Sequence, residues 1–144
     1  MNKYDDTMYE ANRSLMTYGA KPLKSKKRVT LREVLDAARK NGLSHTRHEF
    51  FRLGKHNTTK YNIAGGCALA QAGFNLGINP WELGRKRIGN YRPFEAIIRL
   101  NDNNAKNASL SDIVNKMEKQ YANILDASVE VTEVDYSGVT IEKP

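Results

Sequence analysis

The sequence predicts a mainly α-helical fold, a single compact bundle-like domain with a small C-terminal β-hairpin or extended arm. Apolar residues recur at helical spacing in several segments, and capping residues precede many of them. With 144 residues, of which 40% are hydrophobic, the chain can form one core. We divide it into an N-terminal helix with a basic linker or arm (1–28), a helical domain (29–125) and an acidic β tail (126–144).

The N-terminal part is expected to hold one helix followed by a segment without regular structure. Residues 5–18 carry an apolar stripe that includes Leu15, and Gly19 ends the helix. In residues 20–28, Pro22 and the repulsion between neighbouring cations disfavour regular structure. This segment is therefore expected to be either a phosphate-tracking arm or a spacer.

The best-defined element is a helix over residues 31–41. Thr30 and Glu33 have the spacing of a capping box, in which each side chain accepts a hydrogen bond from the other residue's backbone N–H. A second, shorter helix is expected over about 47–53, although the same residues could form a strand. Residues 54–60 are expected to form a polar loop.

A central core helix is expected over residues 62–76, which are rich in Gly and Ala and nearly uncharged. Gly77 is placed to end it. Further helices are expected over about 79–82 with Asn79 as the cap, over 93–100, and over about 110–125 with Ser109 as the cap, with a polar loop at 101–104. The period then changes to alternation over residues 129–134, which predicts a hairpin or an extended arm that docks on the helices or on another subunit.

Composition excludes several classes of protein. No apolar run reaches the roughly 20 residues that a membrane span needs, and the first twenty residues have no secretory pattern. The one cysteine cannot form an internal disulfide, which fits a reducing compartment. We expect a protein of the cytoplasm of a prokaryotic or phage-infected cell, or of a virion, without a membrane partner.

Charge is distributed unevenly along the chain. Residues 1–99 carry 19 Lys and Arg against 8 Asp and Glu, whereas residues 100–144 carry 4 against 8. A localised basic field attracts polyanions, so DNA or RNA is the expected partner. The alternative is a solvated surface balanced by the acidic tail, in this chain or in a neighbouring one. The residues predicted to contact nucleic acid are Lys24, Lys26, Lys27, Arg28, Arg32, His45, Arg47, Arg52, Lys55, Arg85, Lys86, Arg87 and Arg92.

A helix-turn-helix motif is one interpretation of residues 34–51. Ala38 and Gly42 have the spacing of the motif's small residue and its turn glycine. His48 departs from the pattern, which has an aliphatic residue there, and an ordinary helical hairpin is the alternative. The second helix of the motif would present Ser44, His45, Arg47 and Arg52 to a DNA groove.

Catalytic and metal chemistry have weaker signals. Cys67 follows two glycines near an expected helix N-terminus, where the helix dipole would lower the pKa of its thiol. A buried cysteine that packs as a small hydrophobe is the favoured alternative. His45 and His48 with a single cysteine make a poor ligand set, so we predict no metal, no cofactor and no catalytic residue.

Aromatic residues are interleaved with the basic ones and could stack on bases, although core packing is their default role. They are Phe50, Phe51, Tyr61, Trp81 and Tyr91.

Three segments resemble a family of small uncharacterised helical proteins of actinobacteria and tailed phages. They are the helix that ends at Gly42, the run Gly66-Cys-Ala-Leu-Ala70, and Ile98-Arg-Leu-Asn-Asp102 before a capped helix. The resemblance covers about residues 30–121, with Ala70 and Leu100 where that family often has Gly and Trp. It implies a compact helical domain of phage or prokaryotic source. It also marks Cys67, Asn101 and Asp102 as residues of structural or chemical interest.

The leading hypothesis is a non-enzymatic nucleic-acid-binding protein of phage or prokaryotic type. The first alternative is a phage structural or accessory protein, whose basic arm and C-terminal strand bind protein subunits, either its own copies or virion and host proteins. The second alternative is a small cysteine-dependent enzyme that uses Cys67.

Overall fold

The computed structural model describes residues 3–17, 19–40, 43–47, 49–54, 61–103 and 109–141. Over these residues the chain is an α/β fold with 29% strand, arranged as a two-stranded and a four-stranded sheet. The prediction of a mainly α, all-helical bundle is therefore wrong. The elements in chain order are α1 (Lys3–Thr17), β1 (Lys21–Thr30), α2 (Leu31–Arg39), β2 (Ser44–His45), β3 (Phe51–Leu53), β4 (Tyr61–Gly66), α3 (Ala68–Leu76), α4 (Pro80–Gly84), α5 (Pro93–Asn103), α6 (Leu110–Gln120), the short 3₁₀ helix η1 (Ala122–Ile124), β5 (Ser128–Asp135) and β6 (Val139–Ile141).

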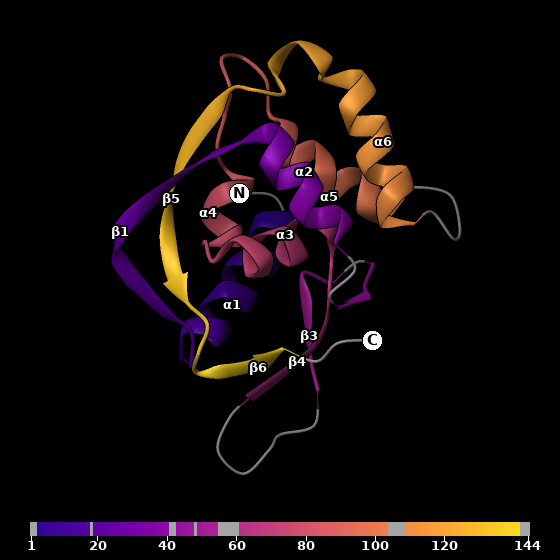
Figure 1. The fold of residues 1–144 in the computed structure, drawn as a ribbon. Coiled ribbons are helices and arrows are strands. Elements are labelled where there is room, and N and C mark those ends of the chain that lie inside the picture. Colours follow the sequence, from indigo (N-terminus) through magenta and orange to yellow (C-terminus); the bar gives the residue numbers. More distant parts are fainter. Residues whose placement is uncertain are drawn as a thin grey trace.

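Strand β1 occupies the segment that the sequence predicted to be a linker or arm. It pairs antiparallel with β5, and the two strands run side by side as a long curved ribbon (Figure 1). Arg28 lies opposite Glu130, so acidic side chains of β5 reduce the repulsion between cations of β1. Pro22 lies beside an irregularity in the register between Pro22 and Lys26, where a missing N–H is tolerated. Pairing with a distant segment thus overrides the local signals against a strand.

The C-terminal strand β5 is held on both of its edges. Besides β1, it contacts the connection between α3 and α4, where the backbone N–H of Asn79 donates to the carbonyl of Thr132 at 3.0 Å. The N–H of Val134 donates to the carbonyl of Gly77 at 2.9 Å. Strand β6 pairs with β4 and not with β5, so the two C-terminal strands do not form the predicted hairpin.

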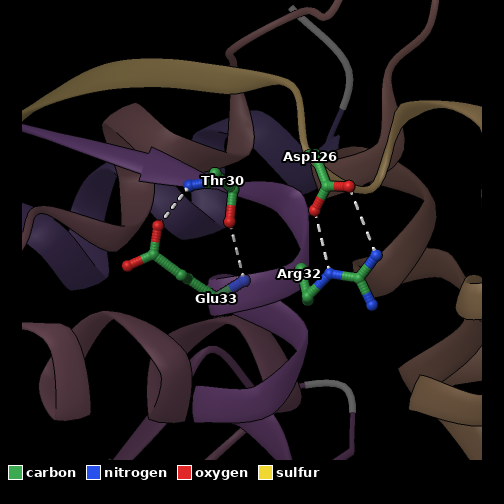
Figure 2. A network of polar contacts seen from close by, with 4 residues as sticks. All are labelled: Thr30, Arg32, Glu33 and Asp126. Carbon is green, nitrogen blue, oxygen red and sulfur yellow. Dashed lines mark hydrogen bonds and ion pairs between the residues drawn. The ribbon is translucent and has the colours of Figure 1, made fainter.

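The start of helix α2 confirms the predicted capping box. The N–H of Glu33 donates to Oγ1 of Thr30, and the N–H of Thr30 donates to Oε1 of Glu33, both at 3.0 Å (Figure 2). The first two helical N–H groups, of Leu31 and Arg32, donate to the carbonyls of Ala127 and Leu125 at 3.1 and 2.8 Å. The segment that leads into β5 therefore completes the cap of α2, in a way that no local pattern could indicate.

The second sheet is built around β4. It pairs antiparallel with β3, while β2 and β6 lie parallel to it along its other edge, one near each end. The helix expected over 47–53 is absent from described residues 47 and 49–53, and β3 lies there instead. The second helix of the proposed helix-turn-helix is therefore missing. The predicted end of the first helix, at Asn41-Gly42, lies outside the described residues, as does His48.

The predicted core helix over residues 62–76 is half right. Its first part is β4, and its second part is α3, which ends at Gly77 with the left-handed φ of 69°. Close packing explains one of the two glycines at the junction, because a Cβ on Gly65 would lie 2.8 Å from Cγ2 of Thr46. Helix α5 extends through the predicted loop to Asn103. The caps expected at Asn79 and Ser109 are present.

The core lies where α2, α3, α5 and α6 meet. Helix α2 packs against both α3 and α6, and α3 packs against α5. Val29, Val131 and Val134 of the ribbon are also buried, which joins the ribbon to the same core. No helix in the described ranges is long and apolar enough to cross a membrane.

Candidate nucleic-acid interface

Two of the predicted contact residues are bound by acids of the C-terminal segment. Arg28 donates to Oγ of Ser128 at 3.0 Å and to Oε1 of Glu130 at 2.9 Å. Nε of Arg32 lies 2.9 Å from Oδ1 of Asp126, as Figure 2 shows. The hydrogen bond from Arg32 lowers the pKa of the Asp126 carboxyl. These are exposed pairs and contribute little stability, but they neutralise positive charge within the chain.

Local pairs neutralise two more of the predicted arginines. Arg52 lies 3.0 Å from Glu49, and the hydrogen bond it donates lowers the pKa of that carboxyl. Arg92 lies 3.5 Å from Glu95. Both pairs join residues three apart in the sequence, so each guanidinium faces an acid of its own segment.

Lys27 is used inside the fold. Its Nζ donates to the carbonyl of Leu76, the last residue of α3, at 3.1 Å. The C-terminus of a helix carries partial negative charge and unpaired carbonyls, so a lysine there stabilises the helix end. Lys27 therefore joins β1 to α3.

Four predicted contact residues have no carboxylate, carbonyl or aromatic partner among the residues that the structure describes. Among the residues that the structure describes, no carboxylate lies within 4.0 Å of the cationic groups of Lys24, Lys26, Lys86 and Arg87. Lys24 and Lys26 are exposed on β1, and Arg87 is exposed in the connection after α4, where Lys86 is half-buried. Lys55 lies outside the described residues.

Arg85 has an aromatic partner. Its guanidinium carbon lies 5.0 Å from the ring centroid of Trp81, a cation–π contact that leaves the side chain exposed.

His45, Asn101 and Asp102 meet in a buried polar cluster. His45 therefore has a partner inside the fold, whereas the sequence predicted that it contacts nucleic acid. The cluster centres on Asn101, whose side chain is fully buried. Its Nδ2 donates to the carbonyl of Thr46 at 2.9 Å and to Oδ1 of Asp102 at 3.1 Å. Its Oδ1 accepts the backbone N–H of Ala68 at 2.9 Å and lies 2.7 Å from Nε2 of His45.

These contacts define the role of each group in the cluster. Because Oδ1 of Asn101 accepts, Nε2 of His45 carries a proton and donates to it. Burial is the main cause that lowers the pKa of His45, and the positive charge of the half-buried Arg47 adds to it. Cys67, at the N-cap position of α3, makes no side-chain capping bond. Asn101 of α5 supplies the cap instead, because its Oδ1 accepts the first N–H of α3.

Cys67 lies at the N-terminus of α3, as the sequence suggested, but it is only 2% exposed. Burial raises the pKa of its thiol to about 11, although backbone N–H groups of Ala70 and Leu69 act in the opposite direction. The thiol therefore stays protonated at neutral pH and lacks the thiolate that nucleophilic catalysis needs. It packs as a small hydrophobe in the core.

We expect Cys67 in the native protein to react with a thiol reagent roughly a hundredfold or more slowly than in the denatured chain, because exposure requires an opening that costs a few kcal/mol. Labelling with iodoacetamide at pH 8, with and without denaturant, measures this ratio. Equal rates in the two states would contradict the buried, protonated thiol.

Sequence reasoning missed the acidic partners and one buried amide. Nε2 of Gln71 donates to the carbonyl of Gly66 at 3.0 Å, and the side chain is 1% exposed. The available signal was a glutamine among the alanines at the start of α3. Glu82 binds the N–H and hydroxyl of Thr132 at 2.6 and 2.9 Å, and only the opposite charge of the two chain halves hinted at such contacts.

Within the described part of the chain, no group of three or more His, Cys, Asp or Glu side chains is placed to hold a metal ion. Comparisons with protein-family models, with curated proteins and with solved structures found no match for this chain.

Proposed function

We propose that this chain is a non-enzymatic nucleic-acid-binding protein of phage or prokaryotic type, acting in the cytoplasm. It contacts phosphates through Lys24 and Lys26 of β1 and through Lys86 and Arg87 after α4. The observation that carries this proposal is that some of the predicted cations have acidic partners within the chain and others have none. Several arginines have acids of the same chain as partners, whereas these four side chains are left without a carboxylate among the described residues.

The chemistry of the four residues suits sequence-independent binding. Lysine is a flexible point charge that binds phosphates without a fixed geometry. Contacts to phosphates position a protein on nucleic acid but carry no sequence information directly. The predicted recognition helix is replaced by β3, so the described residues lack the element that would have read bases in a DNA groove.

Two features disfavour assembly through the C-terminal strand as the function. Strand β5 is already paired with β1 and bound to the α3–α4 connection. The outer edge of β1 carries lysines and an irregular register, features with which proteins prevent pairing with another chain. The burial of Cys67 likewise disfavours a cysteine-dependent enzyme.

Charge reversal at β1 tests the proposal. We expect Lys24→Glu to weaken binding to an oligonucleotide several-fold at low salt and to reduce the salt dependence by about one contact. Fluorescence anisotropy of a labelled oligonucleotide across a salt series measures both effects.

Lys119→Glu on α6 is the matched control, because it changes the net charge equally at an exposed site outside β1 and the connection after α4. We expect it to leave the affinity within about twofold of native. Equal losses in the two variants, or no binding by the native protein at low salt, would overturn the proposal.

A further inference from the structure

We infer that the preferred ligand is single-stranded nucleic acid and that Tyr91 is the side chain on which a base stacks. This inference rests on the proposed function and names its substrate class. The site is the connection from Trp81 to Tyr91, which we call the aromatic–basic loop. It joins exposed cations to one exposed ring.

The fold holds Tyr91 at a fixed position. The N–H of Tyr91 donates to the carbonyl of Ile88, and the N–H of Ile88 donates to the carbonyl of Tyr91, both at 3.0 Å. The two intervening residues form a tight turn, and Gly89 supplies the φ of 59° that a turn of this kind requires. A ring that is held in place before binding loses little conformational entropy when a ligand arrives.

The Tyr91 ring is both supported and accessible. It makes an edge-to-face contact with Tyr121 at a centroid distance of 6.1 Å and an interplanar angle of 84°. It is nevertheless 56% exposed, the highest value among the large hydrophobic side chains that the structure describes. An exposed aromatic ring with a fixed neighbour is a suitable platform for a planar base.

The other predicted aromatic candidates are used by the fold. Phe50 is 5% exposed, and Phe51 packs edge-on against Phe74. Trp81 is half-buried between Tyr9 and Arg85. The side chain of Tyr61 lies outside the described part.

Cations precede the platform along the same loop. The guanidinium of Arg85 is oriented by its contact with Trp81, and Arg87 is exposed. A cation–π-held guanidinium can bind a phosphate or stack on a base, since it is planar and weakly hydrated. Cations next to an aromatic platform are the combination with which proteins bind single strands.

The presence of a stacking ring favours single strands over duplexes. In a duplex the faces of the bases are covered by their neighbours, whereas in a single strand they are available to an aromatic side chain. Phosphate contacts alone would bind both forms, so the discrimination comes from Tyr91.

Substitution of Tyr91 tests the inference. Tyr91→Leu keeps an apolar side chain without a ring, and we expect it to weaken binding to single-stranded DNA or RNA roughly 5- to 100-fold. Binding to a duplex of the same length should change by less than about twofold. Tyr91→Trp keeps the ring and should restore single-strand affinity. Because the side chain is exposed, all variants should keep the native melting temperature, which circular dichroism checks.

The outcomes separate this inference from the proposed function. If the native protein binds duplex and single strands and Tyr91→Leu changes neither, Tyr91 is not a stacking platform and the inference fails alone. If Tyr91→Leu weakens both ligands equally, single-strand preference is refuted. If the native protein binds neither nucleic acid at low salt, the proposed function fails and this inference with it.

Discussion

Deletion of residues 126–144 is expected to unfold the protein. The deletion removes Val129, Val131 and Val134, whose burial contributes roughly 1.5–3 kcal/mol each. It also removes the carbonyl of Ala127, which accepts the first N–H of α2. The sum is comparable with the whole stability of a domain, roughly 5–15 kcal/mol. Thermal unfolding followed by circular dichroism should show no cooperative transition.

A deletion that begins after Ile141 is the control, because it removes none of the residues of β5 or β6. We expect it to melt like the native protein. A chain lacking 126–144 that still unfolds cooperatively near the native temperature would show that the acidic segment is a dispensable arm.

Asn101→Ala is expected to lower the free energy of unfolding by roughly 3 kcal/mol, because it leaves the N–H of Ala68 and the carbonyl of Thr46 buried without their partner. The melting temperature should fall by roughly 10 °C. Chemical denaturation measures the free energy directly.

Asn123→Ala provides the comparison for this prediction. Asn123 is exposed in η1, and its replacement should change the stability by less than about 0.5 kcal/mol. If the two alanine variants are equally stable, the cluster around Asn101 does not hold α3, α5 and the β2 segment together.

Helix starts were the features of the fold that local sequence could predict. The caps at Thr30, Asn79 and Ser109 are side chains that bond a backbone N–H three residues away. Such contacts depend on short-range spacing alone, so a pattern of residue types identifies them. Gly77 is predictable for the same reason, since a left-handed residue ends α3.

Strands escaped prediction where their partners are distant in the sequence. Strand β1 has no alternating apolar pattern because its residues from Lys21 to Lys26 are exposed, and its partner lies about a hundred residues away. Strand β4 merges with α3 in one apolar run, and such a run does not reveal where the period changes. Tertiary pairing decides both cases.

The cations of the candidate site could be predicted from the sequence, but which of them have partners within the chain could not. Residue types alone could not show that Arg32 faces Asp126 or that Lys27 binds the end of α3. The chain is basic before residue 100 and acidic after it, and this pattern alone indicates that the two parts attract each other. The acidic segment neutralises part of the basic one, whereas Lys24 and Lys26 of β1 are exposed and have no carboxylate partner among the described residues.

The salt dependence of binding tests the central claim, that the cations without an acidic partner are the ones that contact nucleic acid. For native protein and a single-stranded oligonucleotide, the logarithm of the association constant should fall linearly with the logarithm of salt concentration. Contacts by Lys24, Lys26, Lys86 and Arg87, with a fifth where Arg85 also binds a phosphate, predict a slope of about −3 to −3.5, from about −0.7 per phosphate. A slope of about −9, as expected if all the predicted residues bound phosphates, or no dependence on salt, would contradict the account.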